Sequence, residues 1–233
     1  LANMVQGSLG NSVYSGPFKG MKLPPSSMVG AYAPQLLGIY EKELWPVFER
    51  VIATPYDMIL NVGCASGYYT TGLALRKPLV RVLAYDINPA EQGRTRDTVT
   101  LNGVQDRIVI GGEFFGEDYA LCANKKTFLL MDIEGTEMVL LDPVKYPALK
   151  QMDILVELHD LFNPRISPTI KERFAATHDI QIIRNQNSLF DFEEITGPVA
   201  YIDPFDSLLA TWENRDGQTP WAFMTARTYS QSL

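Results

Sequence analysis

A short apolar run followed by closely spaced small residues limits what this chain can fold into more than any other feature. Residues 57–71 read Asp-Met-Ile-Leu-Asn-Val-Gly-Cys-Ala-Ser-Gly-Tyr-Tyr-Thr-Thr. The apolar run 58–62 has the length of a strand. Small residues follow at Gly63, Ala65 and Gly67, which indicates a tight turn, and the residues after the turn have a helical pattern. Glycines at such a turn let the backbone approach a ligand closely, so the stretch predicts the first strand, turn and helix of a nucleotide-binding domain.

Strand-like and helix-like segments alternate along the rest of the chain. This alternation predicts an α/β protein with a doubly wound, mostly parallel seven-stranded sheet and helices on both faces. The expected strands are 58–62, 80–86, 107–111, 127–133, 152–158, 180–184 and 221–225. The expected helices are 67–77, 89–101, 114–123, 135–141 and 168–177, and 186–217 reads as irregular because of its Gly and Pro residues.

The N-terminal quarter of the chain has a different pattern. Residues 1–29 are rich in Gly, Ser and Pro and predict an irregular arm, whereas 30–53 has helical periodicity interrupted by Pro46. We therefore expect two parts: an N-terminal arm and helical cap over 1–53, and a ligand-binding domain over 54–233.

The arm carries apolar side chains that require a surface to cover. These are Phe18, Met21 and Met28. We expect the arm and cap to fold over the ligand as a lid, with Tyr40 and Glu41 of the cap close to it, because such a lid would exclude water from a reactive centre.

Composition excludes several classes of function. The formal net charge is −7, and the chain has no Lys/Arg cluster, which argues against binding to nucleic acid. No apolar run approaches the roughly 20 residues that cross a bilayer, and there is no secretory leader pattern, so we expect a cytoplasmic protein with no membrane partner. The two cysteines, Cys64 and Cys122, match neither a disulfide framework nor a zinc site and are expected to be reduced packing residues. The oligomeric state is left open.

The spacing of the small residues separates two kinds of ligand. A dinucleotide fingerprint is Gly-x-Gly-x-x-Gly, whereas here Gly63 is followed by Cys64 and Ala65. The pattern resembles motif I of the class I S-adenosylmethionine-dependent methyltransferases, usually acidic-x-Gly-x-Gly/Ala-x-Gly, with Asn61 at the acidic position. The resemblance implies that S-adenosylmethionine is the cofactor, held by Asn61, Gly63, Ala65 and Gly67. A tight turn without a ligand is the alternative interpretation of this pattern.

Later strand ends supply further candidates for cofactor binding. Asp86 ends the strand 80–86, where doubly wound nucleotide folds place a carboxylate that accepts hydrogen bonds from ribose hydroxyls. Ile87 could cover the adenine, Glu113 could accept from its amino group, and Phe114 could pack on its ring. Each has an ordinary alternative as a turn residue or a helix start.

A second cluster sharpens the family resemblance. The segment 132–137, Asp-Ile-Glu-Gly-Thr-Glu, resembles the Asp-x-Glu-Gly-x-Glu signature of the FkbM-type methyltransferases, and the likeness covers roughly 55–185. The family commonly has Asp, Asn and Lys where this chain has Asn61, Ala65 and Leu130. The resemblance implies a Rossmann-like methyltransferase fold and a small-molecule acceptor such as a sugar or a polyketide.

The ends of the fourth and fifth strands carry the candidate catalytic groups. We expect Asp132 and His159 to lie across the crevice from each other, with Asp132 also close to the cofactor. Asp132 and Glu134 have the same strand parity, and Glu137 is expected to cap the next helix. Glu157 lies in an apolar strand and requires a partner. Either His159 acts as a general base, which we favour, or Asp132, Glu157 and His159 hold a divalent cation.

Three functions are compatible with these residues. The first is O-methylation of a small-molecule hydroxyl with S-adenosylmethionine. The second is a non-catalytic nucleotide-binding protein with a degenerate site, which Asn61 and Leu130 would support. The third, an NAD-dependent oxidoreductase, is disfavoured by Ala65 and Tyr68.

Overall fold

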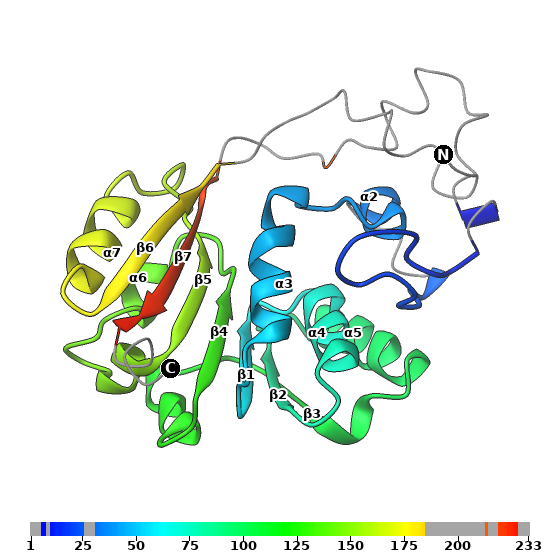
Figure 1. Cartoon of the computed structure of the whole chain (residues 1–233), viewed down its shortest axis with the longest axis horizontal. Helices are drawn as coiled ribbons and strands as arrows, with labels where there is room; N and C mark the ends of the chain where they lie inside the picture. Colours follow the sequence, from blue (N-terminus) through cyan, green and yellow to red (C-terminus); the bar gives the residue numbers. More distant parts are fainter. Residues whose placement is uncertain (1–5, 8–9, 26–30, 185–212, 214–218, 228–233) are drawn as a thin grey trace.

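A mixed sheet runs through the centre of the molecule (Figure 1). The computed structural model describes residues 6–7, 10–25, 31–184, 213 and 219–227. The strands of its sheet are β1 (Met58–Val62), β2 (Arg81–Tyr85), β3 (Ile108–Gly111), β4 (Thr127–Met131), β5 (Asp153–Glu157), β6 (His178–Ile183) and β7 (Trp221–Ala226). They form a 7-stranded sheet in the order β3-β2-β1-β4-β5-β7-β6. The sheet is parallel except that β7 runs antiparallel to both β5 and β6. The expected α/β fold class and mostly parallel sheet are confirmed.

Helices cover both faces of this sheet. They are α2 (Tyr32–Leu37), α3 (Trp45–Ala53), α4 (Tyr68–Arg76), α5 (Pro89–Leu101), α6 (Glu137–Leu140) and α7 (Ile166–Phe174), with 3₁₀ turns η2 (Lys42–Leu44), η3 (Gln105–Arg107), η4 (Gly116–Cys122) and η5 (Pro147–Gln151). Helices α3, α4 and α5 lie on one side of the sheet, and α6 and α7 lie on the other (Figure 1). Two expected helices differ in kind: 114–123 is largely a 3₁₀ helix, and the helix expected over 135–141 has only four residues before the chain reaches Pro143.

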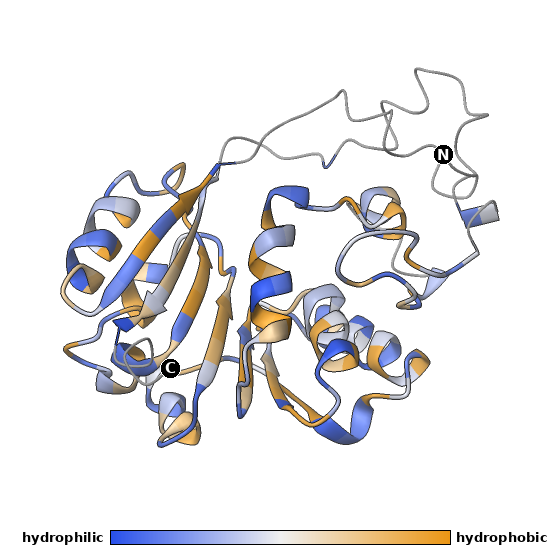
Figure 2. Cartoon of the chain, in the orientation of Figure 1, coloured by the Kyte–Doolittle hydropathy of each residue, from blue (hydrophilic) through white to orange (hydrophobic). Residues whose placement is uncertain are grey.

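The central strands are apolar on both faces because both faces are covered. Every residue of β1, β4 and β5 is buried, and these strands are among the most hydrophobic segments of the molecule (Figure 2). Side chains alternate between two clusters: Ile59 packs with the α3 and α4 side, and Leu60 packs with the α7 side. The sheet is therefore the wall between two cores.

The described part of the arm belongs to one of these cores. Phe18 and Met21 are 3% and 1% exposed and pack in the same cluster as the strand residue Ile59. The Phe18 ring lies 5.2 Å from that of Phe48 and directly above Gly72, where an added Cβ would stand 2.5 Å from the ring. The arm thus has the apolar contact surface that its composition required. Met28 and all of the interval 186–217 except Glu213 lie outside the described residues.

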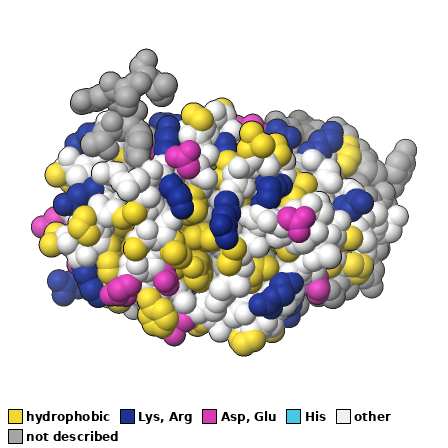
Figure 3. Space-filling view, turned by 90° about the horizontal axis from the view of Figure 1, so that it is seen from below, with side chains coloured by type: hydrophobic (Ala, Val, Ile, Leu, Met, Phe, Trp, Pro, Cys, Tyr) yellow, Lys and Arg dark blue, Asp and Glu magenta, His cyan; other side chains and the backbone are white. Residues whose placement is uncertain are grey.

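Three further features are the charge on the surface, the length of the helices and the state of the cysteines. Basic and acidic side chains are interspersed with apolar ones on the underside of the molecule (Figure 3). Among the residues placed in the structure, no helix has the length and apolar character needed to cross a membrane. Cys64 and Cys122 are both buried and free, as expected for packing residues.

Candidate active site

The turn after β1 brings two strand ends into close contact. Gly63 has φ +84°, and a Cβ added there would stand 1.7 Å from the carbonyl oxygen of Asp132 at the end of β4. Gly67 has φ +80°, and a Cβ there would stand 3.0 Å from Thr95 of α5. Both positions therefore require glycine. Ala65 has a left-handed φ of 43° and is exposed between them, so the turn reaches the surface at the carboxyl edge of the sheet.

Asp86 connects this turn to the end of β2. Its Oδ2 accepts a hydrogen bond from the backbone N–H of Ala65 (2.8 Å), and its Oδ1 accepts one from the backbone N–H of Asn88 (2.9 Å). The carboxylate is half-buried, and each oxygen has a further lone pair. Ile87 beside it is 77% exposed. Asp86 thus shapes the turn as well as being available to a ligand, a structural role that the sequence did not indicate.

Asn61, at the acidic position of the motif, is buried beneath the turn. Its Nδ2 donates to Oγ1 of Thr70 in α4 (2.8 Å). Its Oδ1 is buried and has no hydrogen-bond partner among the described residues. In the β1–β4 register Asn61 is paired with Leu130, which is 1% exposed. Two of the three departures from the family pattern, Asn61 and Leu130, are therefore neighbours in the sheet.

The two candidate adenine contacts after β3 have different surroundings. Glu113 is exposed. Phe114 is 6% exposed and lies in the core, with its ring 5.0 Å from that of Tyr85 and 4.9 Å from that of Tyr119. The adjacent Phe115 is 55% exposed and is the aromatic side chain of this loop that can meet a ligand directly. Sequence periodicity could not separate the two phenylalanines because no regular strand continues through them.

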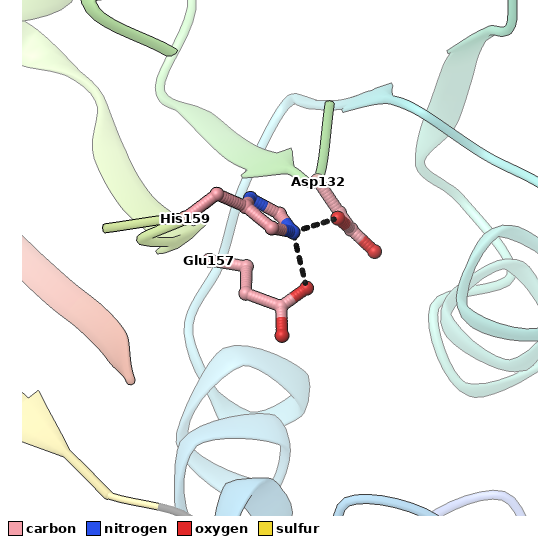
Figure 4. Close-up of side chains that lie close together, drawn as sticks. All are labelled: Asp132, Glu157 and His159. Carbon is pink, nitrogen blue, oxygen red and sulfur yellow. Dashed lines mark ion pairs between the residues drawn. The ribbon is translucent and has the colours of Figure 1, made fainter. Parts of the chain in front are cut away.

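The groups at the ends of β4 and β5 converge (Figure 4). Nε2 of His159 lies 3.6 Å from Oδ1 of Asp132 and 3.4 Å from Oε2 of Glu157. The side chain of Asp132 is 38% exposed, whereas those of His159 and Glu157 are 8% and 9% exposed. The other Glu157 oxygen accepts from Oγ1 of Thr219 (2.5 Å), which supplies a partner for this carboxylate. The expected proximity of His159 and Asp132 is present.

Glu137 does more than begin the next helix. Its side chain is fully buried; Oε1 accepts from the backbone N–H of Gly135 (3.0 Å) and lies 2.5 Å from Nδ1 of His159. The sequence indicated helix capping and missed the contact with His159. Glu134 was expected to share the orientation of Asp132, but β4 ends at Met131, and Glu134 is an exposed turn residue with φ +50°. Strand parity does not extend beyond the end of the strand.

The cluster concentrates negative charge around one imidazole. Burial alone lowers the pKa of His159, but its side-chain interactions with Glu137 and Glu157 and the charges of Glu157 and Asp132 raise that pKa to about 10. Burial and the neighbouring Glu157 carboxyl raise the pKa of Asp132 well above its ordinary value. A positive charge between these carboxylates is thus strongly favoured.

Tyr40 and Glu41 attach the cap to the same edge of the sheet. The Tyr40 ring lies 6.0 Å from that of Tyr69, in the first turn of α4. Glu41 is 2% exposed; its carboxylate accepts from the Tyr69 hydroxyl and from Nε1 of Trp221 (3.2 Å), and its backbone N–H donates to Glu213 (2.7 Å). Glu41 therefore ties the cap to α4 and to the start of β7, and Trp221 had no signal in the sequence beyond its place in an expected strand.

Comparison with known proteins identifies the class of fold. No protein-family model and no curated protein matches the sequence. Among solved structures, the O-methyltransferase TomG from Streptomyces achromogenes, involved in tomaymycin synthesis and in complex with S-adenosylmethionine, is similar with a TM-score of 0.52 and 11% identity over 86% of this chain and 93% of that chain. An O-methyltransferase from Bacillus cereus in complex with S-adenosylhomocysteine is similar with a TM-score of 0.50 and 13% identity over 97% of this chain and 91% of that chain. The chain has the Rossmann-like methyltransferase fold.

Proposed function

We propose that this protein is an S-adenosylmethionine-dependent methyltransferase of the FkbM type that methylates a hydroxyl group of a small molecule such as a sugar or a polyketide. One observation supports this above the others. The carboxylate and imidazole groups of Asp132, Glu157 and His159 converge at the carboxyl edge of the sheet, beside the turn whose Gly63 touches the Asp132 backbone. Open α/β sheets bind ligands at this edge.

The residues of the turn suit the proposed cofactor. The turn 63–67 lies at the carboxyl edge of the sheet, where its Gly63 packs against the Asp132 backbone and its Ala65 is exposed, and this position favours it as the site for the methionine portion. Asp86 has lone pairs for the ribose hydroxyls, and the exposed Ile87 offers an apolar face to the adenine. Tyr40 and Glu41 would close the site from the cap.

Methylation of a hydroxyl requires a group that removes its proton. S-adenosylmethionine, which the turn 63–67 and Asp86 would hold, would supply the methyl group on a sulfonium. The raised pKa of His159 leaves its imidazole charged at neutral pH unless another cation takes the place of its proton. Without a bound metal, the 38% exposed carboxylate of Asp132 beside this charged ring is then the better proton acceptor. Orientation of the two reactants by the surrounding groups would supply much of the rate.

The structure gives less support to an NAD-dependent oxidoreductase and to a non-catalytic binding protein. An NAD-dependent oxidoreductase is disfavoured because the usual dinucleotide sheet has the order 3-2-1-4-5-6, whereas here an antiparallel β7 lies between β5 and β6. Asn61 and Leu130 give little support to the hypothesis of a non-catalytic protein with a degenerate site. These two residues are partners across the strands, so a neutral pair stands where the family would have opposite charges, and no unpaired buried charge results.

Calorimetric titration of the full chain with S-adenosylmethionine, S-adenosylhomocysteine and NAD tests the proposal. We expect saturable binding of the first two and none of NAD. Binding of NAD alone, or of no ligand, would contradict it. Incubation with isotopically labelled S-adenosylmethionine and a panel of hydroxylated sugars and polyketides then separates an enzyme from a binding protein. Labelled product is expected, whereas binding without any transfer would favour the degenerate protein.

A further inference from the structure

We infer that Asp132, Glu157 and His159 form a binding site for a divalent transition-metal ion. Each residue offers one ligand atom, and these atoms all lie within 4.8 Å of one another (Figure 4). The site combines two carboxylates and one imidazole from the ends of the neighbouring strands β4 and β5.

The orientation of the His159 ring is the first argument for a metal. Its Nδ1 lies 2.5 Å from Oε1 of the fully buried Glu137, and a carboxylate oxygen only accepts hydrogen bonds. Nδ1 therefore carries the proton that it donates to Glu137. In the neutral ring, Nε2 is left with a lone pair that points toward two carboxylate oxygens. Three electron-pair donors facing one another repel unless a cation, either a second proton on Nε2 or a metal ion, lies between them. A carboxylate that accepts from the other ring nitrogen of a ligating histidine is a recurrent feature of metal sites.

The separations of the three ligand atoms are the second argument. The distances of 3.4 Å and 3.6 Å from Nε2 to the carboxylate oxygens exceed the roughly 2.7–3.2 Å of an N–H···O hydrogen bond. Ligand atoms about 2.0–2.2 Å from a single ion in tetrahedral geometry stand roughly 3.3–3.6 Å apart. These two separations thus fit an ion between the groups better than a proton shared along either contact, and the third pair of ligand atoms lies within 4.8 Å.

The donor set indicates the class of metal. Imidazole suits Mn²⁺ less than Zn²⁺ or Fe²⁺, carboxylates suit all three, and Ca²⁺ and Mg²⁺ prefer oxygen alone. A site with one imidazole and two carboxylates therefore favours a first-row divalent transition ion. The 38% exposed Asp132 leaves one side of the site open, where water or a substrate oxygen could complete the coordination.

This position gives the metal a role that rests on the proposed function. A divalent cation lowers the pKa of a hydroxyl that it binds, so it would help the acceptor lose its proton near neutral pH. With the metal bound, His159 would be a neutral ligand, and the charge of the ion would offset the negative charges of the two carboxylates in place of a proton on Nε2.

Metal titration of the full chain after dialysis against a chelator tests the inference. Binding of Mn²⁺ is followed by electron paramagnetic resonance of the free ion, and binding of Co²⁺ by its visible absorption. We expect about one ion per chain. Glu157→Gln and Asp132→Asn should each weaken binding at least about tenfold, and Glu137→Gln about 10- to 100-fold as a positioning residue. Glu172→Gln, an exposed carboxylate on α7, is the matched control and should leave the affinity unchanged.

Absence of saturable binding of both ions would overturn the inference, as would affinity unchanged in both Glu157→Gln and Asp132→Asn. Folding of each variant is checked by circular dichroism, and the conservative substitution at the half-exposed Asp132 retains the shape of that side chain. S-adenosylmethionine binding is measured on the same samples. Metal binding without S-adenosylmethionine binding would defeat the proposed function alone, whereas the reverse result would defeat the metal site alone.

Discussion

Replacement of Gly63 by alanine tests whether the close contact between β1 and β4 shapes the site. Gly63 has φ +84°, a conformation that costs an L-residue roughly 1–2 kcal/mol. The new Cβ would lie 1.7 Å from the Asp132 carbonyl oxygen, whereas ordinary contacts begin at 3.4 Å. Relief of that overlap requires the two strand ends to separate, and overpacking of this kind typically costs about 1–3 kcal/mol more. We expect Gly63→Ala to lower the free energy of unfolding by about 2–5 kcal/mol.

Urea unfolding followed by circular dichroism measures this loss. Gly93→Ala is the control, because Gly93 lies in α5 with no atom within 4 Å of an added Cβ. Alanine is the better helix former, so that variant should gain roughly 0.5–1 kcal/mol. A Gly63→Ala protein within about 0.5 kcal/mol of wild type would refute the reasoning. It would mean that the turn can open without cost, and that the position of Asp132 is not set by this contact.

Two further predictions concern the arm and a buried histidine. Phe18→Ala should lower the free energy of unfolding by about 3–5 kcal/mol because it leaves a cavity beside Phe48 in the core. The control, Leu79→Ala at a 97% exposed position, should change it by less than about 0.5 kcal/mol. Equal effects of the two substitutions in urea unfolding would contradict the packing of the arm. Burial lowers the pKa of His178, whose Nε2 lies 2.9 Å from the Met152 carbonyl oxygen. As the pH falls, the unfolded chain therefore binds a proton at this histidine before the folded chain does. The contribution of the neutral His178 to the free energy of unfolding should therefore be fully present above about pH 6.5. Below that pH the free energy of unfolding should fall, more steeply in wild type than in His178→Gln. Equal slopes between pH 5 and 6.5 would count against this assignment.

The opposite pH dependence is expected from His159. In the metal-free chain its folded pKa is raised to about 10, so its contribution to the free energy of unfolding is present below the ordinary value near 6.5 and is lost as the pH rises toward 10. The two histidines thus act in separate pH ranges, so the difference between wild type and His178→Gln in the acidic range carries no contribution from His159.

The layered fold could be predicted because its signals are local. Apolar runs of strand length, such as 58–62, mark strands that are buried on both faces, and Asn88 followed by Pro89 marks the start of α5. The antiparallel direction of β7 could not be read in this way. Residue patterns give the length and burial of a strand but not its direction, and the sequence of 186–217 before it reads only as irregular.

The candidate site was predictable in its strand ends and not in its side-chain contacts. His159 and Asp132 follow neighbouring strands, so their proximity follows from the sheet order. Parity failed at Glu134 because the backbone turns after Met131, and the roles of Phe114 and Phe115 depend on which of them packs with Tyr85. Such contacts are tertiary, and residue spacing alone carries no information about them.

The hydrogen bond between Glu137 and His159 illustrates the same limit. A glutamate at the first position of a helix is sufficiently explained by its interaction with backbone N–H groups, so the sequence offered no reason to seek a second partner. Only the approach of the chain after β5 reveals that this buried carboxylate orients the imidazole.

The affinity of the Asp86→Asn variant for S-adenosylmethionine tests the central claim most directly. The substitution removes the charged carboxylate that would accept hydrogen bonds from the ribose hydroxyls. It also replaces one of the two oxygens that accept from the backbone N–H groups of Ala65 and Asn88 with an NH₂ donor. Loss of a hydrogen bond to a charged group costs about 1.5–3 kcal/mol, which predicts roughly 10- to 150-fold weaker binding in a calorimetric titration. Asp97→Asn makes the same charge change at an exposed position on α5 and should bind as wild type does. Equal affinity in Asp86→Asn and wild type, or no binding by wild type, would contradict the account.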